Sequence, residues 1–275
     1  MLFAGAVGEE ALTHGCGFVL GKSAKGEETI YAAWLGGQDY QNKSGMYGAY
    51  PRGYLERAMM LFPDAERILH LFSGSLTKKQ VTEAWQVANA GDLCRRCWHP
   101  RKMHVQLSSF RDSPCCRICW QYGGECPKGE TEYHAFEPLE VPLQVRFDNG
   151  LHPSAAAAKP DAVGDAQKLL GDLTRAGALD GLPWGWRFDV VFADPPYEQR
   201  DVARYAKESG IKPQMPNKKL VVAQCAQVLR KGGWLVWLDT ARPMYSSKEW
   251  VFRGGVTVVR STNHRVRWAC LLERR

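Results

Sequence analysis

The tetrapeptide Asp194-Pro195-Pro196-Tyr197 combines residue types that suit chemistry on an amino group. The Asp194 carboxylate and the Pro195 carbonyl are both acceptors, so each can accept one N–H of an exocyclic amine. The lone pair of an aromatic amine is delocalised into its ring. Two aligned acceptors favour a tetrahedral nitrogen and stabilise the positive charge that grows on alkylation. The prolines stiffen the turn, and Tyr197 offers a ring for stacking. The alternative is an ordinary proline-rich turn after a strand.

Cysteine spacing predicts a zinc site. Six of the nine cysteines fall between residues 94 and 126, including the pairs Cys94-x2-Cys97 and Cys116-x2-Cys119. Two such thiolate pairs suit one tetrahedral zinc ion, and His104 is the best substitute for one of the cysteines. Further Cys and His residues leave one or two zinc ions open. Four thiolates leave no open position, so the zinc should be structural. The alternative is free thiols in a loop.

The cysteine-rich segment also carries basic and aromatic side chains. Such residues on a small rigid scaffold suit nucleic-acid contact, and the whole chain has a net charge of +7. A structural or protein-docking role for the segment remains the alternative. The basic and aromatic residues are Arg95, Arg96, Trp98, Arg101, Lys102, Arg111, Arg117, Trp120 and Tyr122.

The elements that must position these residues alternate between strand and helix patterns. Continuous apolar runs predict parallel strands, and helical spacing predicts the helices between them. The result is an α/β fold with a mostly parallel sheet and a C-terminal antiparallel hairpin. Strands are predicted at 68–72, 141–147, 162–163, 188–193, 234–238, 255–260 and 266–272. Helices are predicted at 54–62, 81–88, 166–175, 202–207 and 218–229.

Three segments follow from this pattern. Residues 1–47 are predicted to form a loop-rich N-terminal arm, with a hairpin around Thr29–Leu35. Residues 48–91 and 136–275 should form one α/β domain, and residues 92–135 interrupt it as the zinc-binding insertion. We see no signal peptide and no apolar stretch long enough for a membrane span, so we expect a cytoplasmic protein of bacterial or phage type.

Ligands of such sheets bind beyond the carboxyl ends of the strands. Polar residues follow four predicted strands there: Ser73-Gly74-Ser75, Asp148, Asp165 and Asp194. A carboxylate can accept both hydroxyls of a ribose, and Asp165 can accept from an adenine amine. Loop carboxylates without a ligand are the alternative.

The tetrapeptide resembles motif IV of the S-adenosylmethionine-dependent DNA amino-methyltransferases, which make N6-methyladenine or N4-methylcytosine. The resemblance covers residues 48–91 and 140–275 and implies a class I, Rossmann-like methyltransferase fold. Residues 48–61 are similar to the segment that these enzymes place before motif I. Motif I departs from its usual form, because Leu76 stands where a second glycine is expected. The resemblance implies a cofactor site made of Leu71, Phe72, Ser73, Gly74, Ser75, Asp148, Asp165 and Ala166.

The resemblance implies methyl transfer to a base amine in DNA, adenine N6 first and cytosine N4 second, with Asp194, Pro195, Pro196 and Tyr197 as the catalytic residues. The implied cofactor is S-adenosylmethionine, beside the structural zinc. In a duplex the target base must be flipped out. Two alternatives stay open: an RNA methyltransferase acting on an amine such as guanine N2, and a zinc-dependent nucleic-acid-binding protein without catalysis. The sequence leaves the oligomeric state open.

Overall fold

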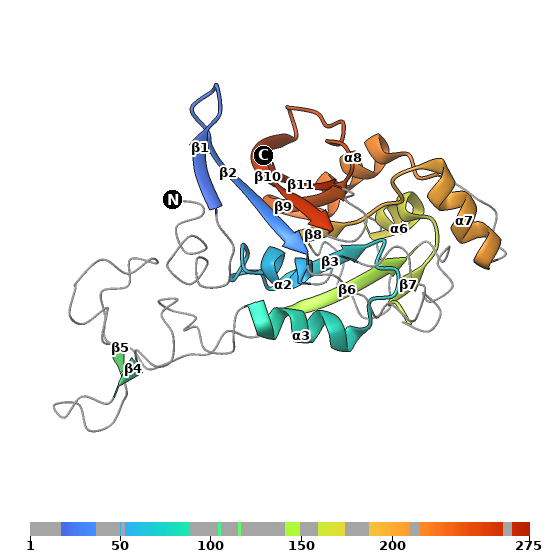
Figure 1. Cartoon of the computed structure of the whole chain (residues 1–275), viewed down its shortest axis with the longest axis horizontal. Helices are drawn as coiled ribbons and strands as arrows, with labels where there is room; N and C mark the ends of the chain where they lie inside the picture. Colours follow the sequence, from blue (N-terminus) through green and yellow to red (C-terminus); the bar gives the residue numbers. More distant parts are fainter. Residues whose placement is uncertain are drawn as a thin grey trace.

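The described residues form a nine-stranded mixed sheet with helices on both faces (Figure 1). In this computed structural model they are residues 18–36, 50, 53–88, 104–105, 115–116, 141–148, 159–173, 187–209, 215–260 and 266–275. The strands of the sheet are β1 (Phe18–Lys22), β2 (Glu28–Gly36), β3 (Arg67–Leu71), β6 (Leu143–Asp148), β7 (Ala162–Val163), β8 (Phe188–Ala193), β9 (Leu229–Asp239), β10 (Trp250–Arg260) and β11 (Val266–Arg274).

The helices are α2 (Tyr54–Met59), α3 (Lys78–Ala88), α6 (Ala166–Leu173), α7 (Gln199–Ser209) and α8 (Lys218–Val228). A separate two-stranded ladder pairs β4 (His104–Val105) with β5 (Cys115–Cys116). The α/β architecture predicted from the sequence is therefore confirmed.

The parallel half of the sheet has the order β7-β6-β3-β8-β9. After β3 the chain builds β6 and β7 on one side, and it then crosses to build β8 and β9 on the other. The order therefore reverses between β3 and β8. In doubly wound sheets this switch point opens a crevice at the carboxyl ends of the strands, where ligands bind.

The C-terminal hairpin is also confirmed. Strand β11 is antiparallel to both of its neighbours, β9 and β10. The hairpin β1–β2 then extends the sheet, because β2 pairs with β10 in parallel. Residues 18–36 are thus part of the sheet, which differs from the expected loop-rich arm. Their docking requires a glycine: Gly254 has a φ of 117°, and a Cβ there would meet the Ile30 carbonyl oxygen at 1.9 Å.

Two apolar clusters lie on opposite faces of the sheet. Alternate residues of β8 belong to different clusters: Val190 and Phe192 pack with α2 and α3, while Val191 and Ala193 pack with α6 and α8. Because both faces are covered, the strand is apolar throughout, as the sequence pattern indicated. The carboxyl ends of β3 and β8 lie side by side in this sheet, whose two faces are covered by helices.

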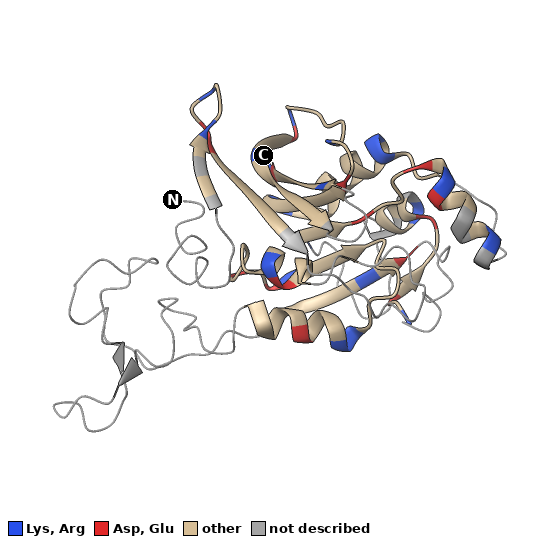
Figure 2. Ribbon diagram, in the orientation of Figure 1, with Lys and Arg blue, Asp and Glu red and all other residues tan. Residues whose placement is uncertain are grey.

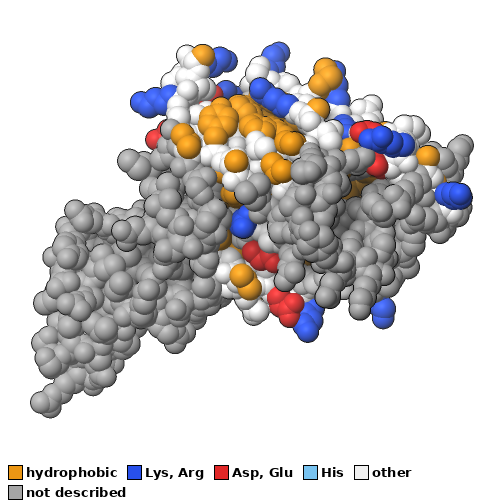
Figure 3. Space-filling model, in the orientation of Figure 1, with side chains coloured by type: hydrophobic (Ala, Val, Ile, Leu, Met, Phe, Trp, Pro, Cys, Tyr) orange, Lys and Arg blue, Asp and Glu red, His pale blue; other side chains and the backbone are white. Residues whose placement is uncertain are grey.

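Charged residues are found mainly along the helices and near the ends of the strands (Figure 2). Apolar side chains gather near the β1–β2 hairpin in the space-filling view, and Val19 and Tyr31 there are 66% and 39% exposed (Figure 3). Within the described ranges, no helix is long and apolar enough to cross a membrane.

Candidate functional site

The loop after β3 is held against the end of β6. The Ser73 amide donates to the Phe147 carbonyl at 2.8 Å, and the Gly74 amide donates to Asp148 Oδ2 at 2.7 Å. Phe72 has a φ of 62°, a conformation that costs energy for an aromatic residue, and Gly74 has a φ of 55°. The glycine-containing loop and the second-strand acid therefore form one unit, as their sequence positions predicted.

Leu76 stands at the position where a second glycine was expected, and its contacts show how the loop closes without that glycine. Its side chain is 9% exposed and packs in the cluster with α2 and α3. Its amide donates to the Ser73 carbonyl at 3.0 Å, and its own carbonyl accepts from Arg146 Nη1 at 3.0 Å. The turn is thus closed by hydrogen bonds and core packing, and Phe72 and Gly74 supply its left-handed backbone.

The tetrapeptide begins where β8 ends, beside this loop. The Asp194 amide lies 3.4 Å from the Leu71 carbonyl, and this hydrogen bond joins the ends of the two strands. Asp194 is only 7% exposed, and Pro195 is buried. The Tyr197 hydroxyl donates to Asp194 Oδ1. One oxygen that could accept a substrate amine is therefore already engaged by the neighbouring phenol.

A buried cation covers the Tyr197 ring. The guanidinium carbon of Arg267, from β11, lies 4.7 Å from the ring centroid, and Arg267 is 5% exposed. Burial, followed by the negative charge of Asp194, raises the pKa of Tyr197, while Arg267 opposes this shift. The phenol stays protonated across the physiological range, so it acts as a donor to Asp194.

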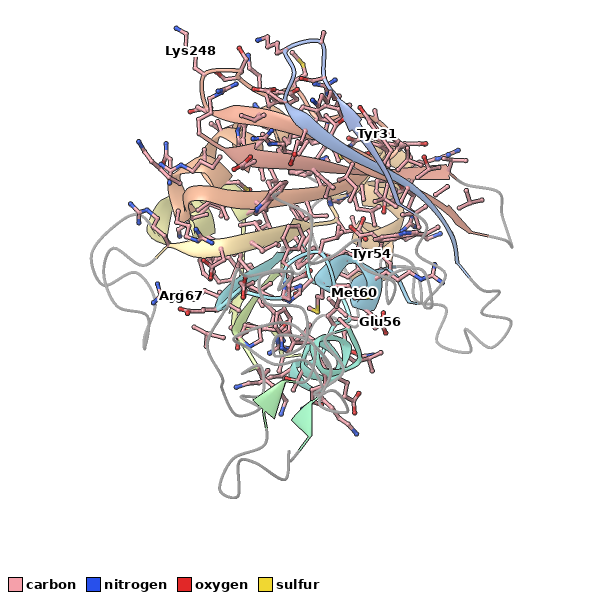
Figure 4. The ribbon with its side chains drawn as sticks, turned by 90° about the vertical axis from the view of Figure 1, so that its left-hand side faces the viewer. Tyr31, Tyr54, Glu56, Met60, Arg67 and Lys248 are labelled. Carbon is pink, nitrogen blue, oxygen red and sulfur yellow. The ribbon has the colours of Figure 1, made fainter. Side chains whose placement is uncertain are left out.

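Two further phenols approach the carboxylate from the N-terminal side. Tyr54 opens α2, next to the sheet (Figure 4), and Tyr50 stacks on it with ring centroids 5.4 Å apart. Burial and then the Asp194 charge raise the pKa of both phenols. Among the described residues, neither hydroxyl has a hydrogen-bond partner. Two phenol donors that have no partner among the described residues are therefore close enough to Asp194 for its charge to raise their pKa.

The main chain of the tetrapeptide is tied to the neighbouring strand. Lys218, the first residue of α8, donates to the Tyr197 carbonyl at 3.2 Å and to Asp239 Oδ2 at 2.7 Å. Asp239 also accepts from Trp237 Nε1 and from the Thr240 amide. This ion pair connects α8, the end of β9 and the tetrapeptide.

The acid predicted after β7 has a structural partner. Asp165 is exposed, and its Oδ1 accepts from the Lys168 amide at 2.9 Å, which caps the start of α6. Ala166 is buried directly behind it. The cap engages one carboxylate oxygen, and the role expected of Asp165 toward an adenine stays a prediction.

The predicted zinc ligands Cys94, Cys97 and Cys119 lie outside the described residues. His104 and Cys116 are described as backbone only, and they are direct partners in the β4–β5 ladder. Across the ranges that the structure describes, no group of three or more Cys, His, Asp or Glu side chains could hold a metal ion. The zinc site therefore stays a prediction.

Sequence reasoning did not assign five residues to this site, namely Tyr50, Tyr54, Lys218, Asp239 and Arg267. Tyr50 and Tyr54 fall in the segment that resembles the region before motif I, which was a usable indication. Lys218 opens a predicted helix, and Asp239 ends a predicted strand. Nothing in the sequence marked Arg267, because a charged residue within a strand is usually exposed.

No protein-family model matches this chain, and no curated protein is detectably similar to it. The functional argument therefore depends on the geometry of the site and on the motif resemblance.

Proposed function

We propose that the protein transfers a methyl group from S-adenosylmethionine to the exocyclic amine of a base in DNA, most favourably adenine N6. One observation carries the proposal: the tetrapeptide lies beside the Ser73–Gly74 loop, at the point where the strand order reverses. A ligand-binding crevice is expected at this point of a doubly wound sheet. The strand order agrees with the class I methyltransferase fold that the motifs suggest.

The residues around the switch point fit the proposed cofactor. Ser73 Oγ is buried and, among the described residues, has no hydrogen-bond partner, so it can donate to a ligand. The Gly74 amide holds one oxygen of Asp148, and this bond orients the carboxylate. Ser73, Gly74 and Asp148 would hold the cofactor, which supplies an electrophilic methyl group when bound.

The role of Asp194 follows from its burial and chemistry. A carboxylate at 7% exposure interacts strongly with a charge that develops on a nearby nitrogen, because little water screens it. It accepts one N–H of the amine, and the Pro195 carbonyl accepts the other. The Tyr197 hydroxyl occupies Asp194 Oδ1, so an amine that uses this oxygen displaces the hydroxyl. The freed phenol ring can then stack on the base.

The zinc proposal receives modest support from the β4–β5 ladder. Cross-strand partners have Cα atoms about 4.5–5.5 Å apart, so the pairing brings two predicted ligand positions, His104 and Cys116, close together. A bound zinc ion would order a segment that is poor in aliphatic residues. In the proposed function this segment helps to contact nucleic acid.

The decisive experiment is methyl transfer from tritium-labelled S-adenosylmethionine to DNA and to RNA, followed by mass spectrometry of the nucleosides. We expect label in DNA as N6-methyladenine. Asp194→Asn should lose at least about 100-fold in rate, the scale of removing one preorganised electrostatic group. Glu83→Gln, at an exposed position of α3, is the matched carboxylate control and should keep wild-type activity.

Each other outcome redirects or rejects the proposal. Label in RNA alone supports the RNA methyltransferase. Calorimetry that detects no binding of S-adenosylmethionine, together with retained DNA binding, supports the non-catalytic alternative. Full activity of Asp194→Asn rejects the mechanism.

A further inference from the structure

Arg267 is a cation buried in an unusual place. It is 5% exposed and lies near the start of β11, at the register position next to the Trp268–Asp239 pair. Because β11 is antiparallel to β9, the start of β11 lies at the carboxyl ends of the parallel strands. Arg267 therefore reaches the same edge of the sheet as the tetrapeptide.

The guanidinium is only partly engaged by the protein. It covers the Tyr197 ring at 4.7 Å, but Nε and Nη1 are buried and have no hydrogen-bond partner among the described residues. Burying a charged donor without a partner costs free energy, and native structures seldom do so without a functional reason. Arg267 and Asp194 contact the same phenol, Arg267 across the ring and Asp194 at the hydroxyl, so the two groups lie on either side of one side chain.

The site therefore presents an acceptor and a donor close together. Asp194 accepts hydrogen bonds, and Arg267 donates them. The opposed effects of Asp194 and Arg267 on the pKa of Tyr54 and of Tyr197 agree with this arrangement. A ligand that satisfies both groups must carry an N–H donor next to an acceptor atom.

We propose that Arg267 determines substrate specificity by donating to the ring nitrogen next to the target amine. This inference rests on the proposed function. The edge it selects is the –N=C–NH₂ unit, which is N1 and N6 in adenine and N3 and N4 in cytosine. An alkylamine, such as a lysine side chain or a polyamine, lacks the acceptor and would leave the guanidinium unpaired. A site built around such a donor rejects substrates that lack the matching acceptor.

The test combines a protein change with the removal of one substrate atom. The probes are single-stranded oligonucleotides with one target adenine, one 1-deazaadenine or, as the matched control, one 7-deazaadenine. Cytosine and 3-deazacytosine form a parallel pair. Wild-type protein and Arg267→Met are compared by kcat/KM for methyl transfer and by fluorescence anisotropy of probe binding.

We expect wild-type protein to lose at least about tenfold in kcat/KM when the nitrogen beside the amine is replaced by carbon. Arg267→Met should lose a similar factor on the natural base and no further factor on the analogue, because the contact is already gone. A change in the intrinsic reactivity of the amine affects both proteins equally, so it cancels in this comparison. The 7-deaza probe should behave like adenine with both proteins.

The proposal would be overturned if the loss caused by Arg267→Met and the loss caused by the deaza probe multiplied when the two changes are combined. Independent losses indicate a phosphate contact or a purely structural role for Arg267. If Arg267→Met does not fold, Arg267→Leu, which also has no donor, replaces it, and an unchanged sensitivity to the deaza probe then rejects the proposal. Wild-type protein that methylates no probe, no DNA and no RNA rejects the proposed function itself, and the role of Arg267 with it.

Discussion

At the scale of single residues, the contact between Tyr197 and Asp194 is the main constraint on the chemistry. The phenol donates to one oxygen of the carboxylate that we propose binds the amine, and Arg267 covers the phenol ring. In the described arrangement, two side chains of the tetrapeptide are therefore hydrogen-bonded to each other. A substrate competes with the hydroxyl for the carboxylate, while the ring contributes stacking.

These two parts of Tyr197 can be separated by substitution. Tyr197→Phe keeps the ring and removes the competing hydroxyl, so we expect kcat/KM within about threefold of wild type. Tyr197→Ala also removes the stacking surface and should lose about 10- to 100-fold, as aromatic–base stacking contributes about 1–3 kcal/mol. Steady-state methyl transfer to an oligonucleotide measures both. Equal losses in the two variants would show that the hydroxyl, and not the ring, is needed.

His70 provides a residue-scale prediction about stability. It is fully buried in β3, stacks on Phe192 and shares a 2.9 Å hydrogen bond with Gln144. Burial lowers its pKa from 6.5 to about 4. Because the unfolded chain binds the proton more tightly than the folded one, the free energy of unfolding falls as the pH drops from about 6.5 to 4. The loss over this window is about 3 kcal/mol.

Urea denaturation of wild type and His70→Phe at pH 7.5, 5.5 and 4.5 tests this prediction. The phenyl ring keeps the stacking and removes the titration, so the variant should show a smaller fall in the free energy of unfolding across this range. Other titrating groups contribute equally to both proteins. If the free energy of unfolding fell equally with pH in both proteins, His70 would not be the titrating group, even if one protein were more stable than the other throughout.

At the scale of elements, the site depends on where strands and helices end. The ends of β3, β6 and β8 are joined by hydrogen bonds that the Ser73, Gly74 and Asp194 amides donate, the one from Gly74 to the Asp148 side chain and the other two to main-chain carbonyls. Lys218 adds the start of α8 and the end of β9. The tetrapeptide is therefore fixed from both sides of the switch point, which restricts the position of the Asp194 carboxylate.

Lys218 is predicted to be a positioning residue. Lys218→Met removes its hydrogen bond to the Tyr197 carbonyl and leaves the buried Asp239 without its cation, so it should lower both stability and kcat. The double variant Lys218→Met/Asp239→Asn removes the unpaired charge as well. It should recover much of the stability while kcat stays at least about tenfold low. Lys219→Met, at the exposed neighbouring position, is the control.

The measurements are thermal unfolding and methyl-transfer kinetics on all four proteins. If kcat returns together with stability in the double variant, Lys218 acts only through folding. A rise in KM with unchanged kcat would show that it affects substrate binding instead of positioning Asp194.

At the scale of the whole molecule, the alternation of strands and helices and the acids at strand ends followed from local pattern, because buried parallel strands are apolar throughout. The docking of β1–β2 on β10 did not follow, since it joins residues more than 200 positions apart. Gly254 permits that contact, but a lone glycine in a strand has several meanings. The partners of Arg267 and Lys218 could not be predicted from the sequence either, because the burial of a basic side chain depends on the elements packed around it.

The chain combines a described sheet that carries the proposed cofactor and amine sites with a cysteine-rich insertion that carries the predicted zinc. Because Ser73, Asp148 and Asp194 all belong to the sheet, cofactor binding should not need the metal. Replacement of Cys94 and Cys97 by Ser should therefore keep the affinity for S-adenosylmethionine within about threefold. It should weaken DNA binding at least about tenfold, as basic contacts held by the insertion are lost.

Calorimetry with S-adenosylmethionine and anisotropy with a DNA duplex, at one fixed salt concentration, measure the two affinities. Metal analysis should find zinc in the wild type and less in the variant. Cys225→Ser is the matched control, because this thiol is buried in α8 and does not belong to the cysteine-rich segment of the sequence. Loss of cofactor binding in the insertion variant would mean that the insertion supports the sheet itself. Unchanged DNA affinity would assign nucleic-acid recognition to other parts of the chain.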